Sequence, residues 1–324
     1  MAVAVYAPAS IGNLGVGFDI LGAALKPIDG SLLGDVVEVD DSISGEFELT
    51  ASGRFAHKLP DDPKQNILYD CFVGIQTLLA EQGTHVGAVK MHLHKNLPIG
   101  SGLGSSASSI VAAVAALNQF FGSPLNEEAQ LRLMGDLEGQ ISGSIHYDNV
   151  APCFVGGIQL MTELDHKLCS TLPSPKSWYW CSAYPGITVS TAEARSILPA
   201  HYSKADIIKH GRLLANFVHA LYAGDDKLAV TMMEDVIAEP YRKVLLPGFE
   251  SARQALLKLG ALAVGISGSG PTLFAVCDDI SVAKQCDAYL AKHYLQNEDG
   301  FSHICRIDEA GVANVEIQSE TTHS

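Results

Sequence analysis

The chain has 324 residues, of which 47% are hydrophobic and 18% charged, and its formal net charge is −15. This length predicts about two domains with a sizeable core. The acidic balance argues against nucleic acid or an anionic membrane as the main partner, because both require a basic surface. No apolar run reaches the roughly 18 residues of a membrane span. We therefore expect a globular protein that binds neither nucleic acid nor membrane.

The N-terminus and the cysteines point to the cytoplasm. Residues 1–6 lack a basic region and predict a first strand, not a signal peptide. The seven cysteines are scattered and never form a C-x-x-C pair. This usage is typical of a reduced cytoplasmic protein without a structural zinc site.

A glycine- and serine-rich stretch, residues 98–109, stands between a strand predicted over 89–94 and an apolar helix predicted over 110–121. Gly100, Gly102 and Gly104 permit close backbone approach and positive φ. The amides that open the helix would then face an anion. Hydroxyls of Ser105 and Ser106 could reach a phosphate oxygen or a magnesium ion. A flexible linker is the alternative, but linkers seldom lie between two core-type segments.

This stretch is not a Walker A loop, since no Gly-Lys-Ser/Thr closes it. It resembles the phosphate loop Pro-x-Gly-x-Gly-Leu-Gly-Ser-Ser-Ala of the GHMP kinases. The resemblance implies that ATP is bound by Pro98, Ile99, Gly100, Ser101, Gly102, Leu103, Gly104, Ser105, Ser106, Ala107 and Ser108.

An earlier segment, residues 4–22, predicts a strand that breaks at Pro8 and enters a glycine-containing loop with Asn13 and Asp19. These two residues could simply cap a turn. However, Pro-Ala-Ser-x-Gly-Asn-Leu-Gly-x-Gly-Phe-Asp-x-Leu-Gly resembles the first motif of homoserine kinases among the GHMP kinases. The resemblance implies that Asn13 and Asp19 contact an amino-acid substrate, with Asp19 facing its ammonium group.

Strand-like runs at 36–39 and 47–49 precede a helix predicted over 66–82. Asn66 is a candidate N-cap of that helix. In the family this asparagine lies near adenine, and the two roles are compatible.

A second helix ends near Glu138, which lies off the apolar stripe of Leu131, Met134 and Leu137. Residues 139–152 are polar and could form a solvated loop. They also resemble homoserine kinases, which implies that Glu138 joins Ser106 in holding Mg²⁺. His146, Asp148 and Asn149 would then line the substrate side.

In the second half of the chain we expect a strand over 154–161, which runs through two glycines. The polar stretch 165–176 is the expected domain boundary. Helices are expected over 191–199, 204–223, 230–237 and 282–295, a last strand over 310–317, and a frayed tail over 320–324. The glycine-rich turn and strand of 265–276 resemble the third GHMP motif, which supports the phosphate loop. We expect domains at 1–165 and 166–324, with the last strand returning to the first domain.

Arg195 and Arg242 lie in Thr-x-x-x-Arg and Glu-Pro-x-Arg stretches that resemble those of homoserine kinases. A guanidinium suits a carboxylate bidentately, whereas an ordinary arginine more often forms a surface ion pair. The resemblance also places Thr191 and Gly268 beside the substrate.

The resemblance implies an α+β fold, with a ribosomal-S5-like N-terminal domain and a ferredoxin-like C-terminal domain. It implies transfer of the ATP γ-phosphoryl group to the hydroxyl of L-homoserine, a step toward threonine, by Asn149, Asp148, Arg195 and Glu138. We expect no obligatory base, because a loose transition state needs little activation of the nucleophile. Two alternatives are another GHMP small-molecule kinase and an inactive member that senses a ligand. The interpretation leaves room for a homodimer.

Overall fold

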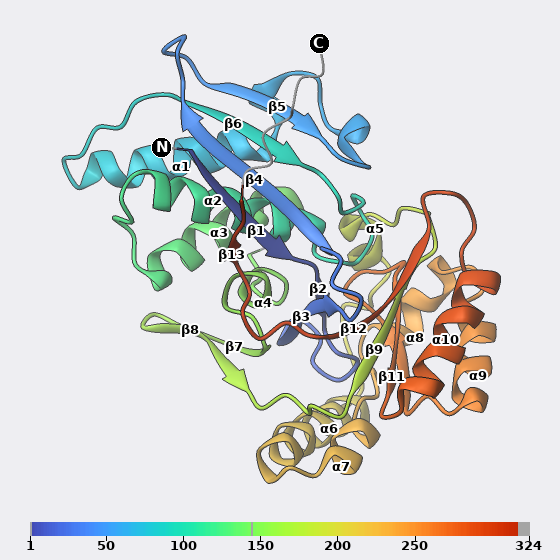
Figure 1. Cartoon of the computed structure of the whole chain (residues 1–324). Coiled ribbons are helices and arrows are strands. Elements are labelled where there is room, and N and C mark those ends of the chain that lie inside the picture. Colours follow the sequence, from blue (N-terminus) through green and yellow to red (C-terminus); the bar gives the residue numbers. More distant parts are fainter. Residues whose placement is uncertain (1, 144, 317–324) are drawn as a thin grey trace.

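The computed structural model describes residues 2–143 and 145–316 as a mixed α and β protein with two sheets (Figure 1). The first sheet has the strand order β13-β1-β4-β6-β5, and only the β5–β6 pair is parallel. Its strands are β1 (Val3–Pro8), β4 (Gly34–Asp41), β5 (Glu48–Ser52), β6 (Val89–His94) and β13 (Ala313–Asn314).

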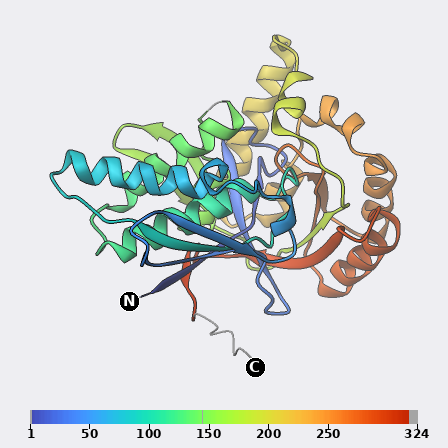
Figure 2. The same cartoon turned by 90° about the horizontal axis from the view of Figure 1, so that it is seen from above.

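Helices cover one face of this sheet, as Figure 2 shows from above. They are α1 (Ile67–Glu81), α2 (Ser105–Phe120), α3 (Glu127–Ser142) and the short α4 (Val150–Val155). Helix α2 lies between the sheet and its neighbouring helices. Its small buried side chains, such as Ala112, Ala113 and Ala116, allow the close approach that this central position requires.

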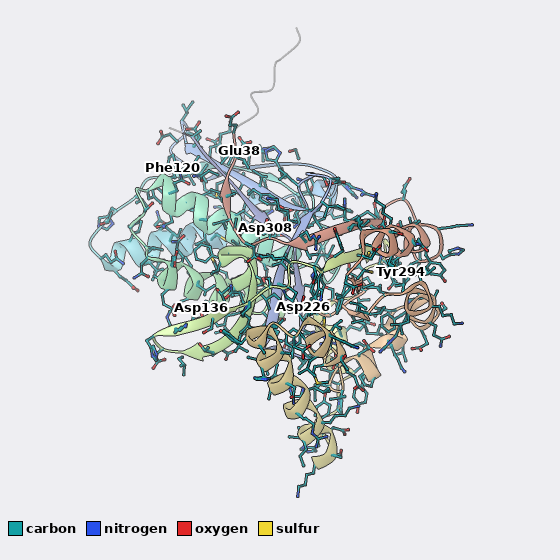
Figure 3. All side chains as sticks on the ribbon, turned by 60° about the horizontal axis from the view of Figure 1, so that its bottom comes forward. Glu38, Phe120, Asp136, Asp226, Tyr294 and Asp308 are labelled. Carbon is teal, nitrogen blue, oxygen red and sulfur yellow. The ribbon has the colours of Figure 1, made fainter. Side chains whose placement is uncertain are left out.

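The second sheet has the order β10-β11-β9-β12-β3-β7-β8, with β2 beside β3. Its strands are β2 (Ser10–Gly12), β3 (Leu21–Pro27), β7 (Ile158–Leu164), β8 (Lys167–Leu172), β9 (Tyr179–Tyr184), β10 (Ala263–Ile266), β11 (Leu273–Cys277) and β12 (Phe301–Ile307). Early and late parts of the chain therefore share one sheet. In Figure 3, Asp308 lies centrally, where the chain leaves β12 on its way to β13.

Both faces of the second sheet are packed. Trp178 and Trp180 of one face contact α6 (Lys204–Ala223), whereas Cys181 and Ala183 of the other contact α9 (Phe249–Leu259) and α10 (Ile280–His293). This is the period of a strand buried on both sides. The remaining helices are α5 (Thr191–Ser196), α7 (Asp226–Thr231) and α8 (Glu239–Arg242), with 3-10 turns at Ala56–Lys58, Pro63–Gln65 and Lys243–Leu245.

Several predicted elements are confirmed. The strand over 89–94 is β6, and the helix over 204–223 is α6, with Leu213, Phe217 and Leu221 buried. Asn66 caps α1, since its Oδ1 accepts from the Leu68 amide at 3.1 Å. The α+β fold class is also confirmed.

Two sequence predictions are wrong, and the stretch predicted as a boundary contains a strand. The strand over 154–161 is a helix end followed by β7, because Gly156 and Gly157 have φ of 81° and 70° and cannot continue a strand. The stretch 165–176 contains β8, which pairs with β7. The helix over 230–237 ends at Thr231, since the Asp235 carboxylate binds the amides of 237–239 and holds a turn there.

The ends of the second half also differ from the sequence pattern. The last strand is shorter than the predicted 310–317 and pairs with β1. Residues 317 and 320–324 lie outside the described residues, and the division at 165 stays a prediction. Within 2–143 and 145–316, no helix has the length and apolar composition to cross a membrane.

A substitution at Gly22 tests the contact between β3 and the segment before α4. A Cβ at Gly22 would lie 1.6 Å from the Asp148 carbonyl oxygen. We expect Gly22→Ala to lower the unfolding free energy by about 3 kcal/mol or more in urea denaturation, because two backbones must separate. Gly87→Ala is the control, since its Cβ would meet nothing within 4 Å. Equal stability of both variants would contradict the packing.

Candidate active site

A cavity of about 390 Å³ is lined by residues from widely separated parts of the chain. They are Asn13, Asp19, Leu59, Ile67, Lys95, Ile99, Gly100, Ser101, Gly102, Gly104, Ser105, Ser106, Ser109, Glu138, Ile141, His146, Asp148, Asn149, Thr188, Ser190, Thr191, Ala192, Arg195, Arg242, Gly268 and Ser269. The cavity has the size and mixed lining of a small-molecule site. It therefore gathers most of the residues that the sequence singled out.

The glycine loop has the backbone that was expected of an anion site. Gly100, Gly102 and Gly104 have φ of 66°, 79° and 63°. A Cβ at Gly104 would lie 2.2 Å from the Ser10 hydroxyl, so this position requires glycine for space as well as for conformation. Gly104 is also the N-cap of α2. The loop is thus followed directly by the N-terminus of a 16-residue helix, which is the positive end of the helix dipole.

Four successive loop carbonyls accept hydrogen bonds from outside the loop. The pairs are Gly100 O with Val189 N (3.0 Å), Ser101 O with Thr272 N (3.0 Å), Gly102 O with Ser267 Oγ (2.5 Å) and Leu103 O with Ser10 N (3.1 Å). The predicted support of the loop by residues 265–276 is confirmed. Donors from outside the loop therefore hold its backbone in place.

Several residues predicted to bind ATP do not line the cavity. They are Asn66, Pro98, Leu103, Ala107 and Ser108. Ser108 donates to the Ala7 carbonyl at 2.8 Å and accepts from the Asp35 amide at 3.0 Å. Ser108 therefore joins α2 to the first sheet. Ile67, beside Asn66, does line the cavity, together with Leu59 and Ile99.

Ser106 and Glu138 meet beside the loop. The Ser106 hydroxyl donates to Glu138 Oε1 at 2.7 Å, and burial raises the pKa of Glu138. Burial destabilises the charged carboxylate, and a nearby cation would stabilise it. A hydroxyl and a carboxylate next to a phosphate loop fit the oxygen preference of Mg²⁺. Among the described residues no cluster of three His, Cys, Asp or Glu side chains could hold a metal.

His146 and Asp148 form a buried pair, with Nδ1 and Oδ1 3.1 Å apart. Burial lowers the pKa of His146, but the hydrogen bond to Asp148 and the charges of Asp148 and Glu138 outweigh it, so the pKa is raised above its ordinary value. A protonated imidazole cannot accept a proton. Asn149 lies next to this pair and its Oδ1 accepts from the Ser10 hydroxyl at 3.0 Å.

Charged groups from the first motif and from α5 meet at one end of the cavity. Asp19 and Arg195 form a bidentate pair with both N–O distances 2.9 Å. The Asp19 amide donates to Asn13 Oδ1, and both residues have positive φ, 57° and 70°. Thr191 opens α5 and also lines the cavity.

Arg242 is 3% exposed and fixed by the protein. Its Nε donates to the Ala194 carbonyl at 3.0 Å, and its Nη1 donates to the Gly268 carbonyl at 2.9 Å. Asn13 Nδ2 donates to the same carbonyl. The guanidinium carbon of Arg242 lies 5.1 Å from the centre of the Phe18 ring.

Lys95 and Ser109 also line the cavity but were not predicted as site residues. Asp35, which contacts both, was not predicted either. A lysine between a strand and the glycine loop was the available signal. Nothing in the sequence connects it to Asp35, 60 residues earlier.

The comparisons with known proteins agree with this geometry. The family models for the GHMP kinases N terminal domain and the GHMP kinases C terminal match residues 66–157 and 217–295. A homoserine kinase from Cytophaga hutchinsonii is 32% identical, with a TM-score of 0.86 and coverage of 97% of each chain. This chain belongs to the GHMP kinase family.

Other solved structures share the fold at lower identity. A putative homoserine kinase from Listeria monocytogenes is 20% identical, covering 98% of this chain and 100% of its own, with a TM-score of 0.71. A mevalonate kinase from Methanococcus jannaschii is 16% identical, covering 95% of this chain and 98% of its own, with a TM-score of 0.68. This GHMP kinase is therefore a phosphotransferase with a small-molecule site.

The His146–Asp148 pair predicts a pH-dependent stability. Because the folded pKa of His146 is raised, its contribution is present below the unfolded value and is lost as pH rises through the folded pKa. His146→Gln should therefore cost more unfolding free energy at about pH 6 than at about pH 9, measured by urea denaturation. His166→Gln, on an exposed turn, is the control. A pH-independent difference would show that the pair is not charged.

Proposed function

We propose that the protein phosphorylates the hydroxyl of L-homoserine with ATP, giving O-phospho-L-homoserine and ADP. The observation that carries the proposal is the meeting of Asp19, Arg195 and Arg242 at one end of the cavity that also holds the phosphate loop. An amino acid presents an ammonium and a carboxylate, and this group offers one anion and two cations. Similarity to the homoserine kinase of Cytophaga hutchinsonii supports the same substrate.

Each charged residue has a proposed role. Asp19 would bind the substrate ammonium, and Arg195 and Arg242 would bind its carboxylate. Arg242 offers a fixed site because protein carbonyls hold it, whereas Asp19 and Arg195 are 34% and 28% exposed and can exchange partners. Asn13, Thr191 and Gly268 would complete the substrate side. This arrangement leaves the side-chain hydroxyl of homoserine to extend toward the loop.

Phosphoryl transfer would need mainly positioning and charge neutralisation. The hydroxyl oxygen attacks the γ-phosphorus, the bond to the β–γ bridging oxygen breaks so that ADP leaves with that oxygen, and the hydroxyl proton passes to an oxygen of the transferred phosphoryl group or to water. Asn149 would orient the hydroxyl, and Asp148 would keep His146 protonated near the developing charge. Mg²⁺, held by Ser106 and Glu138, would supply neutralisation of the phosphate oxygens.

We also propose the division into domains at 1–165 and 166–324, with β13 returning to the first sheet. The nucleotide base would lie against Leu59, Ile67 and Ile99, the apolar part of the cavity lining. The reaction would serve threonine biosynthesis in the cytoplasm.

An acceptor panel tests the proposed substrate. ADP release should be fastest with L-homoserine and at least about tenfold slower with L-serine, L-threonine, mevalonate or galactose, since these lack the reach or the zwitterion. Reactions without acceptor give the background. Preference for mevalonate or galactose would replace this function by that of another GHMP kinase, and no turnover with any acceptor would favour a ligand sensor.

The charged end of the cavity predicts a selective defect. Asp19→Asn removes the negative charge with little change in shape, and each charged hydrogen bond contributes about 1.5–3 kcal/mol. We expect the KM for homoserine to rise by about tenfold or more while the Kd for ATP stays unchanged. Asp61→Asn, on an exposed loop, is the control. Equal weakening of ATP and homoserine would contradict the assignment of Asp19 to the amino acid.

A further inference from the structure

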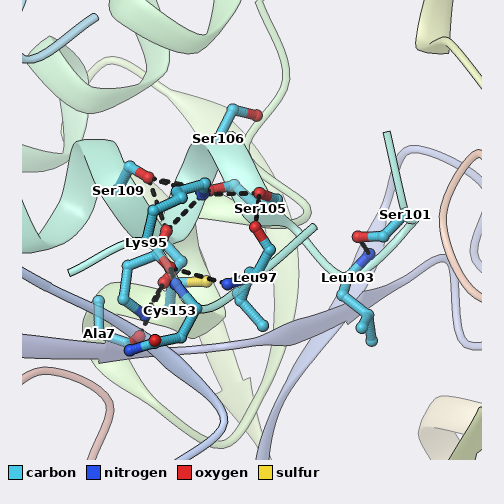
Figure 4. Close-up of polar contacts among 12 residues, drawn as sticks. Ala7, Lys95, Leu97, Ser101, Leu103, Ser105, Ser106, Ser109 and Cys153 are labelled. Carbon is cyan, nitrogen blue, oxygen red and sulfur yellow. Dashed lines mark hydrogen bonds and ion pairs between the residues drawn. The ribbon is translucent and has the colours of Figure 1, made fainter. Parts of the chain in front are cut away.

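Lys95 lies directly after β6 and is 2% exposed. Its ammonium is surrounded by oxygens, at 2.5 Å from Asp35 Oδ2, 2.7 Å from Ser105 Oγ, 3.0 Å from the Ser105 carbonyl and 3.0 Å from Ser109 Oγ (Figure 4). The ammonium has three N–H donors, and these oxygens offset its lost hydration.

Asp35, on β4, is fully buried and is equally well paired. Besides Lys95, its carboxylate accepts from the amides of Asn96 and Leu97 at 2.8 and 3.0 Å and from Ser109 Oγ at 2.6 Å. The pair therefore joins three elements: the strand β4, the chain that leaves β6 for the glycine loop, and the first turns of α2.

We propose that Lys95 and Asp35 form a positioning pair that fixes the start of α2 against the phosphate loop and thereby sets the affinity for the triphosphate of ATP. Lys95 acts through Ser105, whose hydroxyl also donates to the Leu97 carbonyl at 3.1 Å. Ser106, the next residue, faces Glu138. A displacement of Ser105 would carry Ser106 with it.

The location of the pair favours this role over a purely structural one. Replacing a buried ion pair by uncharged groups often leaves stability unchanged, so stability alone does not require two charges here. Lys95 and Ser109 line the cavity and contact Ser105 at the start of α2, whereas Arg195 and Arg242 lie near Asp19. The pair therefore lies at the end where the loop and the helix would hold phosphate.

The proposal rests on the assignment of the loop to the phosphates of ATP, which is part of the proposed function, and not on the identity of the acceptor. Measuring nucleotide affinity without an acceptor tests the loop assignment independently of the identity of the acceptor. If the wild-type protein binds ATP but does not phosphorylate homoserine, the substrate assignment fails and the role of Lys95 is still tested.

The experiment compares Lys95→Met, the double variant Asp35→Asn/Lys95→Met and Lys90→Met by calorimetric titration with ATP, ADP and adenosine, and by thermal unfolding. Lys95→Met leaves a buried unpaired carboxylate and should unfold at lower temperature. The double variant carries no buried charge and should regain stability, since the asparagine oxygen can still accept from the amides of 96 and 97. Lys90 is exposed on β6, the strand that Lys95 directly follows, and is the matched control.

We expect the double variant to bind ATP about tenfold or more weakly than the wild type while adenosine affinity changes by less than about twofold. Lys90→Met should bind both like the wild type. A double variant that regains wild-type ATP affinity together with stability would overturn the proposal, as would an equal loss for ATP and adenosine.

Ser109→Ala provides a second test that creates no buried charge and does not depend on the folding of the double variant. It removes one hydroxyl that contacts both Lys95 and Asp35. ATP affinity should fall several-fold relative to adenosine affinity. Unchanged ATP affinity in this variant would also contradict the positioning role.

Discussion

A loop that binds phosphate through its amides must have its carbonyl groups bound elsewhere. Here the carbonyls of residues 100–103 accept from four donors: Ser10, Val189, Ser267 and Thr272. These donors come from the first strands, from the segment before α5 and from the turn between β10 and β11. The loop geometry therefore depends on the whole fold, and the two sheets can be understood as the scaffold that brings these donors together. A sheet shared by early and late strands suits this task, because it fixes both halves of the chain relative to the loop.

The charge of the chain sets a second constraint. A protein with a net charge of −15 opposes a polyphosphate at long range, so attraction must come from nearby groups. The amides and the positive end of α2 supply part of it. A lysine beside this helix end would ordinarily oppose the helix dipole. Asp35 offsets that charge, so Lys95 can hold the Ser105 carbonyl and hydroxyl without weakening the helix.

Local patterns in the sequence predicted what local forces decide. The glycine spacing of 100–104, the Asn66 cap and the amphipathic α6 were all recoverable, because each depends on residues close in sequence. Contacts between distant residues were not recoverable from patterns. The helix α4 was missed because its first residues lie in the polar stretch 139–152 and its last residues in the strand predicted over 154–161, which also included the Gly156-Gly157 turn that ends the helix. The Lys95–Asp35 pair was missed because nothing local indicates that β4 and β6 are neighbours.

The Asp19–Arg195 pair links the resting site to substrate choice. Both side chains are about one-third exposed, so substrate charges can reach them and replace their partners. Arg242 differs, since two carbonyls and the Phe18 ring hold it in place. Under the proposed function, the substrate carboxylate would bind Arg242 and Arg195, while Asp19 would exchange Arg195 for the substrate ammonium. A neutral sugar offers no charge to replace the broken pair, so it would leave Asp19 and Arg195 joined across the site. The same pair that a zwitterion can open thus disfavours acceptors without an ammonium group.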